Sequence, residues 1–146
     1  MALEIERKFL VINSLFKEMA YRCEEIRQGY LNRLPERTVR VRTLDDNGFL
    51  TVKGKNKGAV RHEFEYDIPF EDACTMLKMC EPPLVEKSRY LVDYEGLTWE
   101  VDEYHGSREG LIVAEVELPS EDFEYKKPPF AGKEVTGDPS YYNSNL

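Results

Sequence analysis

The sequence predicts a mainly β (α+β) protein, an eight-stranded antiparallel β-barrel that forms a tunnel and carries a few peripheral helices. About eight segments alternate polar and apolar side chains with a period of two, which is the pattern of β-strands. Short turns join most of these segments, which favours antiparallel neighbours that curl into a barrel. Because 146 residues with 41% hydrophobic content suit one folded unit, we expect residues 1–146 to form a single domain.

The first predicted strand runs from Glu4 to Val11. Side chains alternate between the two faces of a strand, so Glu4, Glu6 and Lys8 share one face. The other face carries Leu3, Ile5 and Phe9. Further strands are expected over residues 25–32, 38–44, 49–55, 61–68, 84–94, 97–104 and 111–118.

The connections between the strands carry helix and turn signals. Helices are expected after Asn13-Ser14, over residues 70–80, and from Ser120 to Phe123. The segment 45–48 reads Asp-Asp-Asn-Gly and predicts a hairpin, because Asn-Gly favours a tight turn between two strands. We therefore place the turn over residues 45–48.

The polar faces of the predicted strands are sorted by charge. Acidic pairs two residues apart occur at Glu4/Glu6, Glu63/Glu65, Glu100/Asp102 and Glu115/Glu117, and basic pairs at Arg40/Arg42, Lys53/Lys55 and Lys87/Arg89. Like charges on one strand face repel, and a solvated surface does not require this arrangement. If the polar faces point inward, the barrel encloses separate patches of carboxylates and cations. Carboxylates bind hard divalent cations, and Arg and Lys bind phosphate oxygens.

A second interpretation places the same charged faces on the outside of the protein. There they would pair across strands, each pair contributing about 0.2–1 kcal/mol. In the inward arrangement, the apolar faces point outward and need a cover. The three expected helices are few for that purpose, and a homodimer would supply more cover.

Composition excludes several classes of function. The net charge of −8 argues against general nucleic-acid binding. No apolar run is long enough to span a membrane, and Cys23, Cys74 and Cys80 are odd in number and lack CxxC spacing, which is typical of reduced thiols in a cytoplasmic protein. His62 and His105 fit no zinc site or catalytic triad, and the sequence has no P-loop motif.

The opening Glu4-Ile5-Glu6-Arg7-Lys8 resembles the ExExK signature of the CYTH superfamily, the triphosphate tunnel metalloenzymes. Later blocks follow in the family's order: Arg27-Gln28-Gly29-Tyr30-Leu31, Val39-Arg40-Val41-Arg42, Leu50-Thr51-Val52-Lys53-Gly54, Glu63-Phe64-Glu65, Glu86-Lys87-Ser88-Arg89-Tyr90, Trp99-Glu100-Val101-Asp102 and Ala114-Glu115-Val116-Glu117. The closing Gly132-Lys133-Glu134-Val135-Thr136 is also similar, so the resemblance covers nearly the whole chain.

This resemblance implies an enzyme that hydrolyses or cyclises a triphosphate with Mg²⁺ or Mn²⁺ inside the barrel. The residues that it implies for phosphate binding are Lys8, Arg40, Arg42, Lys53, Lys87 and Arg89. Those that it implies for the metal are Glu4, Glu6, Asp102, Glu115 and Glu117. Glu63 and Glu65 would complete the acidic wall and orient the attacking water, and Tyr30 resembles a family tyrosine close to Lys8, so these four are the catalytic set.

The expected substrate is inorganic tripolyphosphate, cleaved to pyrophosphate and phosphate. Short bacterial members of the superfamily with a similar start and second strand look most like tripolyphosphatases, and the chain shows no evident aromatic and amide set for a nucleotide base. The alternatives are a class IV-type adenylyl cyclase that converts ATP to cyclic AMP and pyrophosphate, a thiamine triphosphatase, and a non-catalytic sensor of polyphosphate or nucleotides. The retained acidic pairs favour an enzyme over a sensor.

Overall fold

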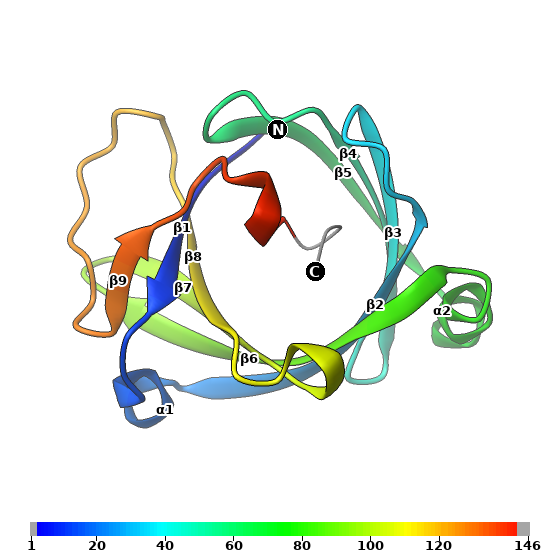
Figure 1. Ribbon diagram of the computed structural model, residues 1–146, viewed down its shortest axis with the longest axis horizontal. Helices are drawn as coiled ribbons and strands as arrows, with labels where there is room; N and C mark the ends of the chain where they lie inside the picture. Colours follow the sequence, from blue (N-terminus) through cyan, green and yellow to red (C-terminus); the bar gives the residue numbers. More distant parts are fainter. Residues whose placement is uncertain (1–2, 143–146) are drawn as a thin grey trace.

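Residues 3–142 are described by the computed structural model, and over this range eight antiparallel strands close into a barrel (Figure 1). Around the barrel the strands follow the order β5-β4-β3-β2-β6-β7-β8-β1, and β1 pairs with β5 to close the sheet. The eight strands are β1 (Leu3–Val11), β2 (Arg22–Asn32), β3 (Arg37–Leu44), β4 (Asn47–Gly54), β5 (Val60–Ile68), β6 (Glu81–Tyr94), β7 (Leu97–Tyr104) and β8 (Ile112–Glu117). The predicted barrel is confirmed.

A ninth strand, β9 (Ala131–Glu134), was not predicted. The first residues of β1 pair with β5, whereas Phe9 and Val11 at its other end pair with β9. Beyond β9 the chain stays bound to β1, since Val135 N donates to Lys8 O at 2.8 Å and Lys8 N donates to Thr136 Oγ1 at 2.9 Å. The last described part of the chain is thereby held at one end of the barrel (Figure 1).

Two α-helices lie outside the barrel, α1 (Leu15–Met19) and α2 (Phe70–Leu77) (Figure 1). Helix α2 packs on β3 and β4 through Ala73 and Leu77, which are buried with Val41. Gly48 permits this approach, because a Cβ at that position would lie 2.8 Å from the Cβ of Ala73. The helix thus covers part of the outward apolar face of the sheet.

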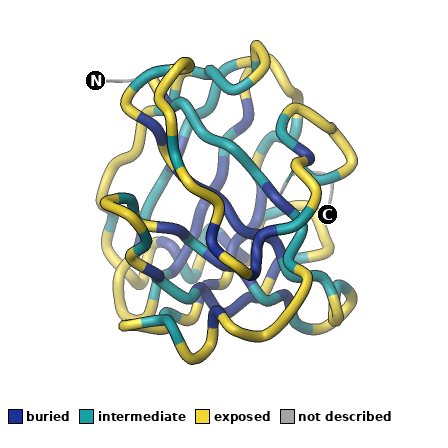
Figure 2. Tube along the Cα trace, turned by 90° about the vertical axis from the view of Figure 1, so that its left-hand side faces the viewer, coloured by how far each residue is buried: buried dark blue, intermediate teal, exposed yellow. Residues whose placement is uncertain are grey.

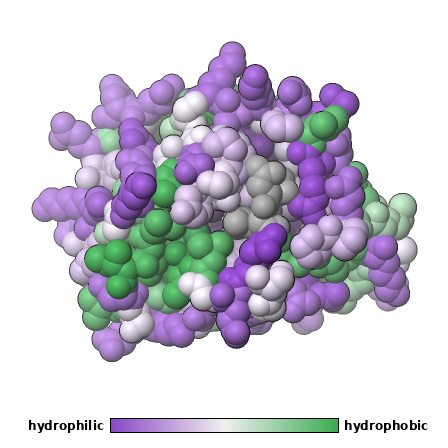
Figure 3. Space-filling model, viewed as in Figure 1, coloured by the Kyte–Doolittle hydropathy of each residue, from purple (hydrophilic) through white to green (hydrophobic). Residues whose placement is uncertain are grey.

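The largest apolar core also lies on the outside of the barrel. It joins the outward residues of β1, β7 and β8 to Phe16 of α1 and to Phe130, which precedes β9. Buried residues follow the middles of the strands, and exposed residues concentrate in the loops (Figure 2). Seen down the barrel, apolar surface gathers near α1 and near α2, where Ile12 and Met79 are exposed (Figure 3).

Several predicted boundaries were wrong. The hairpin predicted over residues 45–48 is present, but its turn is only Asp45-Asp46. Asn47 already pairs with Leu44, so Gly48 lies inside β4 beneath α2. The helix predicted over residues 70–80 ends at Leu77.

The segment from Ser120 to Phe123 forms a turn rather than a helix. Ser120 Oγ donates to Asp122 Oδ1 at 2.8 Å, so its hydroxyl binds a side chain instead of capping a helix. Strands β2 and β6 each begin three residues before their predicted starts, and they extend each other by pairing from Arg22 to Tyr30. The sequence at these strand ends is polar or contains proline and shows little alternation of polar and apolar residues, so the pattern did not predict them.

The three cysteines are free thiols. Over residues 3–142, no helix is both long enough and apolar enough to cross a membrane.

Candidate active site

The inward faces of the strands form a cavity of about 150 Å³, here called the acidic cavity. Its described lining consists of charged side chains alone: Glu4, Glu6, Arg40, Arg42, Lys53, Glu63, Glu65, Arg89, Glu100, Glu115 and Glu117. The sequence interpretation that placed the charged faces inward is therefore confirmed, and the solvated alternative is wrong for these residues.

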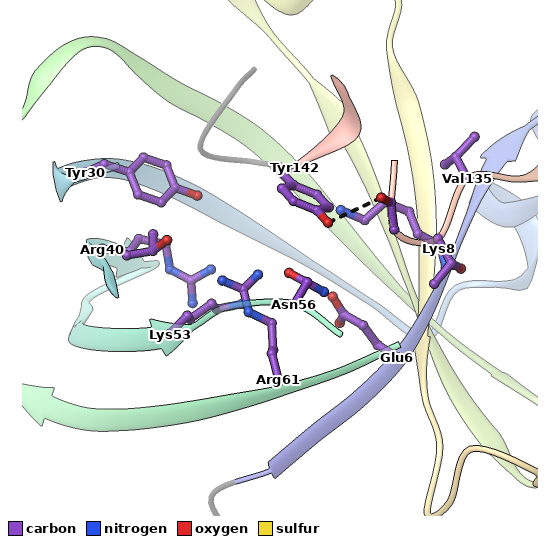
Figure 4. A pocket seen from close by; sticks show the side chains of 12 residues that line it. Glu6, Lys8, Tyr30, Arg40, Lys53, Asn56, Arg61, Val135 and Tyr142 are labelled. Carbon is purple, nitrogen blue, oxygen red and sulfur yellow. Dashed lines mark hydrogen bonds between the residues drawn. The ribbon is translucent and has the colours of Figure 1, made fainter. Parts of the chain in front are cut away.

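A second cavity of about 40 Å³, here called the cationic cavity, shares Glu6, Arg40 and Lys53 with the acidic cavity. Its lining is Glu6, Lys8, Tyr30, Thr38, Arg40, Lys53, Asn56, Arg61, Val135, Thr136, Gly137 and Tyr142 (Figure 4). Four of these side chains are cationic and one is a carboxylate. The tunnel thus has a carboxylate-rich part and a cation-rich part that meet at three shared residues.

Most predicted site residues lie in one of these cavities. The acidic cavity holds Glu4, Glu6, Arg40, Arg42, Lys53, Glu63, Glu65, Arg89, Glu115 and Glu117, and the cationic cavity adds Lys8 and Tyr30. Lys87 and Asp102 are buried and line neither cavity.

Eight lining residues were not predicted as site residues: Thr38, Asn56, Arg61, Glu100, Val135, Thr136, Gly137 and Tyr142. Arg61 precedes Glu63 and Glu65 at the strand period, so alternation along β5 is a signal that could have found it. Asn56 and Tyr142 follow the ends of their elements, where no period exists to place them.

Glu4 and Glu6 form a buried acidic pair on β1. Burial raises the pKa of Glu4 to about 8, opposed by Lys53, whose Nζ lies 3.7 Å from Glu4 Oε1. Burial, together with Glu115 and Glu4, raises the pKa of Glu6 well above its usual value. Glu4 Oε1 has no hydrogen-bond partner among the described residues. A divalent cation would satisfy this orphaned oxygen and favour ionisation of both carboxyls.

The pKa values of Glu63 and Glu115 are shifted in the opposite direction, below their ordinary value. Burial acts to raise the pKa of Glu63, but a hydrogen bond with Glu4 and the charge of Lys53, 3.2 Å away, lower it to about 2. Burial likewise opposes ionisation of Glu115, but Lys8, 3.6 Å away, holds its pKa at about 2. These two carboxylates stay ionised at neutral pH, so the acidic cavity combines protonated and ionised groups.

Asp102 is bound by two cations. Arg89 Nε and Nη2 donate to its two carboxylate oxygens at 2.8 and 2.9 Å, and Lys87 Nζ lies 2.6 Å from Oδ2. Despite burial, these cations hold the pKa of Asp102 well below its usual range. Burial lowers the pKa of Lys87 to about 8. Both Asp102 oxygens are therefore occupied in this structure, which places this carboxylate behind the cavity wall as a support for Arg89.

The donor set of the acidic cavity fits a hard divalent cation. Carboxylate oxygens are the ligands that Mg²⁺ and Mn²⁺ prefer, and the cavity presents seven carboxylates. Within residues 3–142, however, no three His, Cys, Asp or Glu side chains already converge as a formed metal site. The acidic cavity therefore gathers carboxylates that could bind such an ion, without holding three of them in a formed site among the described residues.

Comparison with known proteins gives consistent results. Residues 2–142 match the CYTH domain family. The chain is 50% identical over 147 residues to the inorganic triphosphatase of Acetivibrio thermocellus, covering 100% of this chain and 94% of that protein. It is 35% identical over 147 residues to the inorganic triphosphatase of Nitrosomonas europaea, covering 98% and 95%. The crystal structure of the inorganic triphosphatase NE1496 superposes with a TM-score of 0.67 at 32% identity, covering 97% of this chain and 95% of that chain. The chain therefore belongs to the CYTH family.

Proposed function

We propose that this protein is a metal-dependent triphosphatase that cleaves inorganic tripolyphosphate to pyrophosphate and phosphate inside the barrel. The observation that carries the proposal is the tunnel itself, in which carboxylates and cations line two adjoining cavities that share Glu6, Arg40 and Lys53. The names of the two inorganic triphosphatases that resemble the chain along nearly its whole length support the same reaction.

The cations that line the tunnel bind the phosphate groups. Arg40 and Lys53 lie where the two cavities meet, with Lys8 on one side and Arg42 and Arg89 on the other. Arg and Lys neutralise phosphate oxygens and fix the position of the chain, and positioning with electrostatic stabilisation provides most of the catalysis in phosphoryl transfer.

Two buried groups outside the cavities support this set. Asp102 holds the guanidinium of Arg89 against the tunnel, and Lys87 pairs with Asp102, so both act on phosphate through Arg89. The roles that the family resemblance implies for them, phosphate binding and metal binding, stay predictions.

Glu4, Glu6, Glu115 and Glu117 would hold Mg²⁺ or Mn²⁺ through oxygen. Such an ion supplies charge neutralisation on the phosphate oxygens. Glu63, whose pKa of about 2 keeps it ionised, accepts a hydrogen bond from the attacking water and orients it. Glu65 accepts a 2.9 Å hydrogen bond from Arg42 Nη2 and aligns that guanidinium.

Tyr30 belongs to the catalytic set on the cationic side. It lines the cationic cavity together with Lys8, so its hydroxyl is available to a phosphate oxygen there.

A second candidate reaction uses ATP, by hydrolysis or by cyclisation. A pocket of about 190 Å³, here called the mouth pocket, is lined by Pro35, Thr38, Lys55, Asn56, Arg61, Pro139 and Tyr142. It shares Thr38, Asn56, Arg61 and Tyr142 with the cationic cavity. Two prolines and a tyrosine offer apolar contact to a nucleoside, which favours ATP as the alternative substrate.

Product analysis tests these proposals. Purified protein with Mg²⁺ or Mn²⁺ is given tripolyphosphate and ATP in separate reactions, and the products are separated by ion chromatography. We expect equal amounts of pyrophosphate and phosphate from tripolyphosphate, and much slower turnover of ATP. Cyclic AMP with pyrophosphate from ATP would make the protein a cyclase, and binding without turnover of either would make it a sensor.

We further propose that the protein acts in the cytoplasm as a homodimer. Its three free thiols suit a reducing compartment. On the outer face of β5, Phe64 and Tyr66 are 41% and 60% exposed, and Val52 pairs beside Phe64 on β4. A second copy would cover this apolar row. Sedimentation velocity tests the dimer: Phe64→Asp with Tyr66→Asp should give the monomer, and a monomeric parent protein would contradict it.

A further inference from the structure

The tunnel cations differ in whether they have a carboxylate partner. Ion pairs join Lys8 to Glu115, Arg42 to Glu65, Lys53 to Glu4 and Glu63, and Arg89 to Asp102 and Glu100. Within the part of the chain that the structure describes, Arg40 and Arg61 line the cationic cavity without such a partner. Arg61 Nε is also buried and makes no hydrogen bond there.

Arg61 shares the cationic cavity with three other cations and one carboxylate, Glu6, and forms an ion pair with none of the described carboxylates. Its side chain rises from β5, and its guanidinium lies in the cavity beside Lys53, Arg40 and Asn56 (Figure 4). Like charges that face a shared, partly enclosed space repel one another, and an anionic ligand relieves that repulsion. Asn56 adds an amide donor at the same place.

Arg61 lies where the cationic cavity joins the mouth pocket, which is also lined by Lys55. It lines both the cationic cavity and the mouth pocket, whereas Lys8, Arg40 and Lys53 line only the inner of these two spaces. A triphosphate bound along Arg40 and Lys53 would therefore direct one of its ends to Arg61.

The two substrate candidates differ at that end. Inorganic tripolyphosphate ends in a terminal phosphate on both sides, and each carries up to two negative charges. ATP has one terminal phosphate, because its α-phosphate is esterified, carries a single charge and continues into a nucleoside. An arginine without a carboxylate partner matches the doubly charged terminal group better.

We propose that Arg61 binds the terminal phosphate nearest the mouth and thereby makes the tunnel select inorganic tripolyphosphate over nucleoside triphosphates. This inference rests on the proposed triphosphatase function. It assigns Arg61 to specificity, while the inner cations serve any triphosphate. The prolines and Tyr142 of the mouth pocket remain able to contact a nucleoside without Arg61.

The test compares Arg61→Gln with the parent protein, using Arg61→Lys and Lys57→Gln as controls. For each protein, kcat and KM are measured for tripolyphosphate with Mn²⁺, and ATP is titrated as an inhibitor of that reaction. Lys57 is exposed in the same loop as Asn56, so Lys57→Gln removes the same charge without touching either cavity. Thermal unfolding of all four proteins verifies that they are folded.

We expect Arg61→Gln to lower kcat/KM for tripolyphosphate at least about tenfold, equivalent to ~1.4 kcal/mol, mainly by raising KM. The inhibition constant of ATP should change less than about threefold. The preference of the protein for tripolyphosphate over ATP therefore becomes smaller. Arg61→Lys should recover part of the loss, and Lys57→Gln should behave like the parent protein.

Three results would overturn the inference. The first is an unchanged kcat/KM for tripolyphosphate in Arg61→Gln. The second is a rise in the inhibition constant of ATP as large as the fall in kcat/KM for tripolyphosphate. The third is a fall in kcat/KM in Lys57→Gln as large as that in Arg61→Gln. Each leaves the triphosphatase proposal intact, because that proposal fails only if the parent protein releases no phosphate from tripolyphosphate.

Discussion

At the scale of single residues, Asp102 shows how one buried carboxylate organises the cations around it. It is 2% exposed and bonds both Arg89 and Lys87. Removing one partner of a buried ion pair leaves the other charge uncompensated, which is costly. Glu100 also contacts Arg89, at 3.2 Å, but its side chain is 41% exposed, so solvent screens the pair.

These two carboxylates give a matched pair of variants. We predict that Asp102→Asn lowers the free energy of unfolding by about 3 kcal/mol or more, because Arg89 and Lys87 then repel each other without a counter-charge. Glu100→Gln should cost less than about 1 kcal/mol. Urea unfolding of both variants measures the difference. Equal, small losses would show that Asp102 does not hold the two cations together.

Glu4 gives a prediction that depends on pH. Its pKa is about 8 in the folded protein against 4.5 as its ordinary value, so the folded state binds this proton more tightly than the unfolded chain. Protonated Glu4 therefore stabilises the folded state relative to ionised Glu4. This contribution is complete below pH 4.5 and is lost as the pH rises through 8. Glu4→Gln should therefore raise the Tm of the metal-free protein at pH 8 more than at pH 5, as thermal scans at the two pH values would show.

The same variant should lower turnover at least about 100-fold, because an amide is a poor replacement for an ionised metal ligand. Glu117→Gln is the companion variant, since burial also raises the pKa of Glu117. Survival of activity in both variants would show that these carboxylates do not hold the metal.

At the scale of elements, the close contact between α2 and β4 depends on a glycine. A Cβ at Gly48 would lie 2.8 Å from Ala73 Cβ and 3.0 Å from Ile68 O, and neither backbone-fixed group can swing away. We predict that Gly48→Ala destabilises the protein by about 1–3 kcal/mol in urea unfolding. Gly54→Ala is the control, because its Cβ would meet His62 Cβ at 3.5 Å, an ordinary contact. An unchanged free energy of unfolding in Gly48→Ala would mean that α2 can move away from β4 at little cost.

Much of the element structure followed from sequence, because period-two alternation depends only on local geometry. It sorted the charged residues of β1, β3, β4, β5 and β8 onto one face of each strand, and the family resemblance placed that face inside the barrel. The predicted turn was two residues too long, because Gly48 favours tight turns but here permits close helix packing inside β4. Strand β9 has four residues and forms only through pairing with β1, a contact between distant segments that local pattern does not encode.

The site was predictable to a similar depth. Alternation and family resemblance located twelve of the proposed residues in the two cavities. The ion pairs of Asp102 depend on how β6 and β7 are registered, with Arg89 opposite Asp102, and register is a tertiary property. Alternation along β5 could have placed Arg61 on the inner face, but its lack of a carboxylate partner among the described residues is visible only in the three-dimensional arrangement.

At the scale of the whole molecule, the protein stores repulsion that a bound ion would relieve. The net charge is −8, and seven carboxylates line the acidic cavity. We predict that Mn²⁺ or Mg²⁺ at about 100 times its Kd stabilises the fold by about 2.7 kcal/mol and raises Tm by roughly 5 °C or more. The rise should be larger at pH 8 than at pH 6, since Glu4 and Glu6 must lose their protons to bind metal.

Differential scanning fluorimetry measures this stabilisation, with Glu4→Gln combined with Glu6→Gln as the control that should abolish it. A Tm unaffected by both ions at both pH values would contradict a metal site in the acidic cavity.

The central claim is that metal and triphosphate meet inside the barrel, and a crystal structure with Mn²⁺ and tripolyphosphate tests it most directly. Anomalous scattering locates manganese without reference to any assumed site. We expect an anomalous peak bound by oxygens of Glu4, Glu6, Glu115 or Glu117, with phosphate density along Arg40 and Lys53 that extends to Arg61. Manganese or phosphate bound only on the outer surface, with both cavities empty, would contradict it.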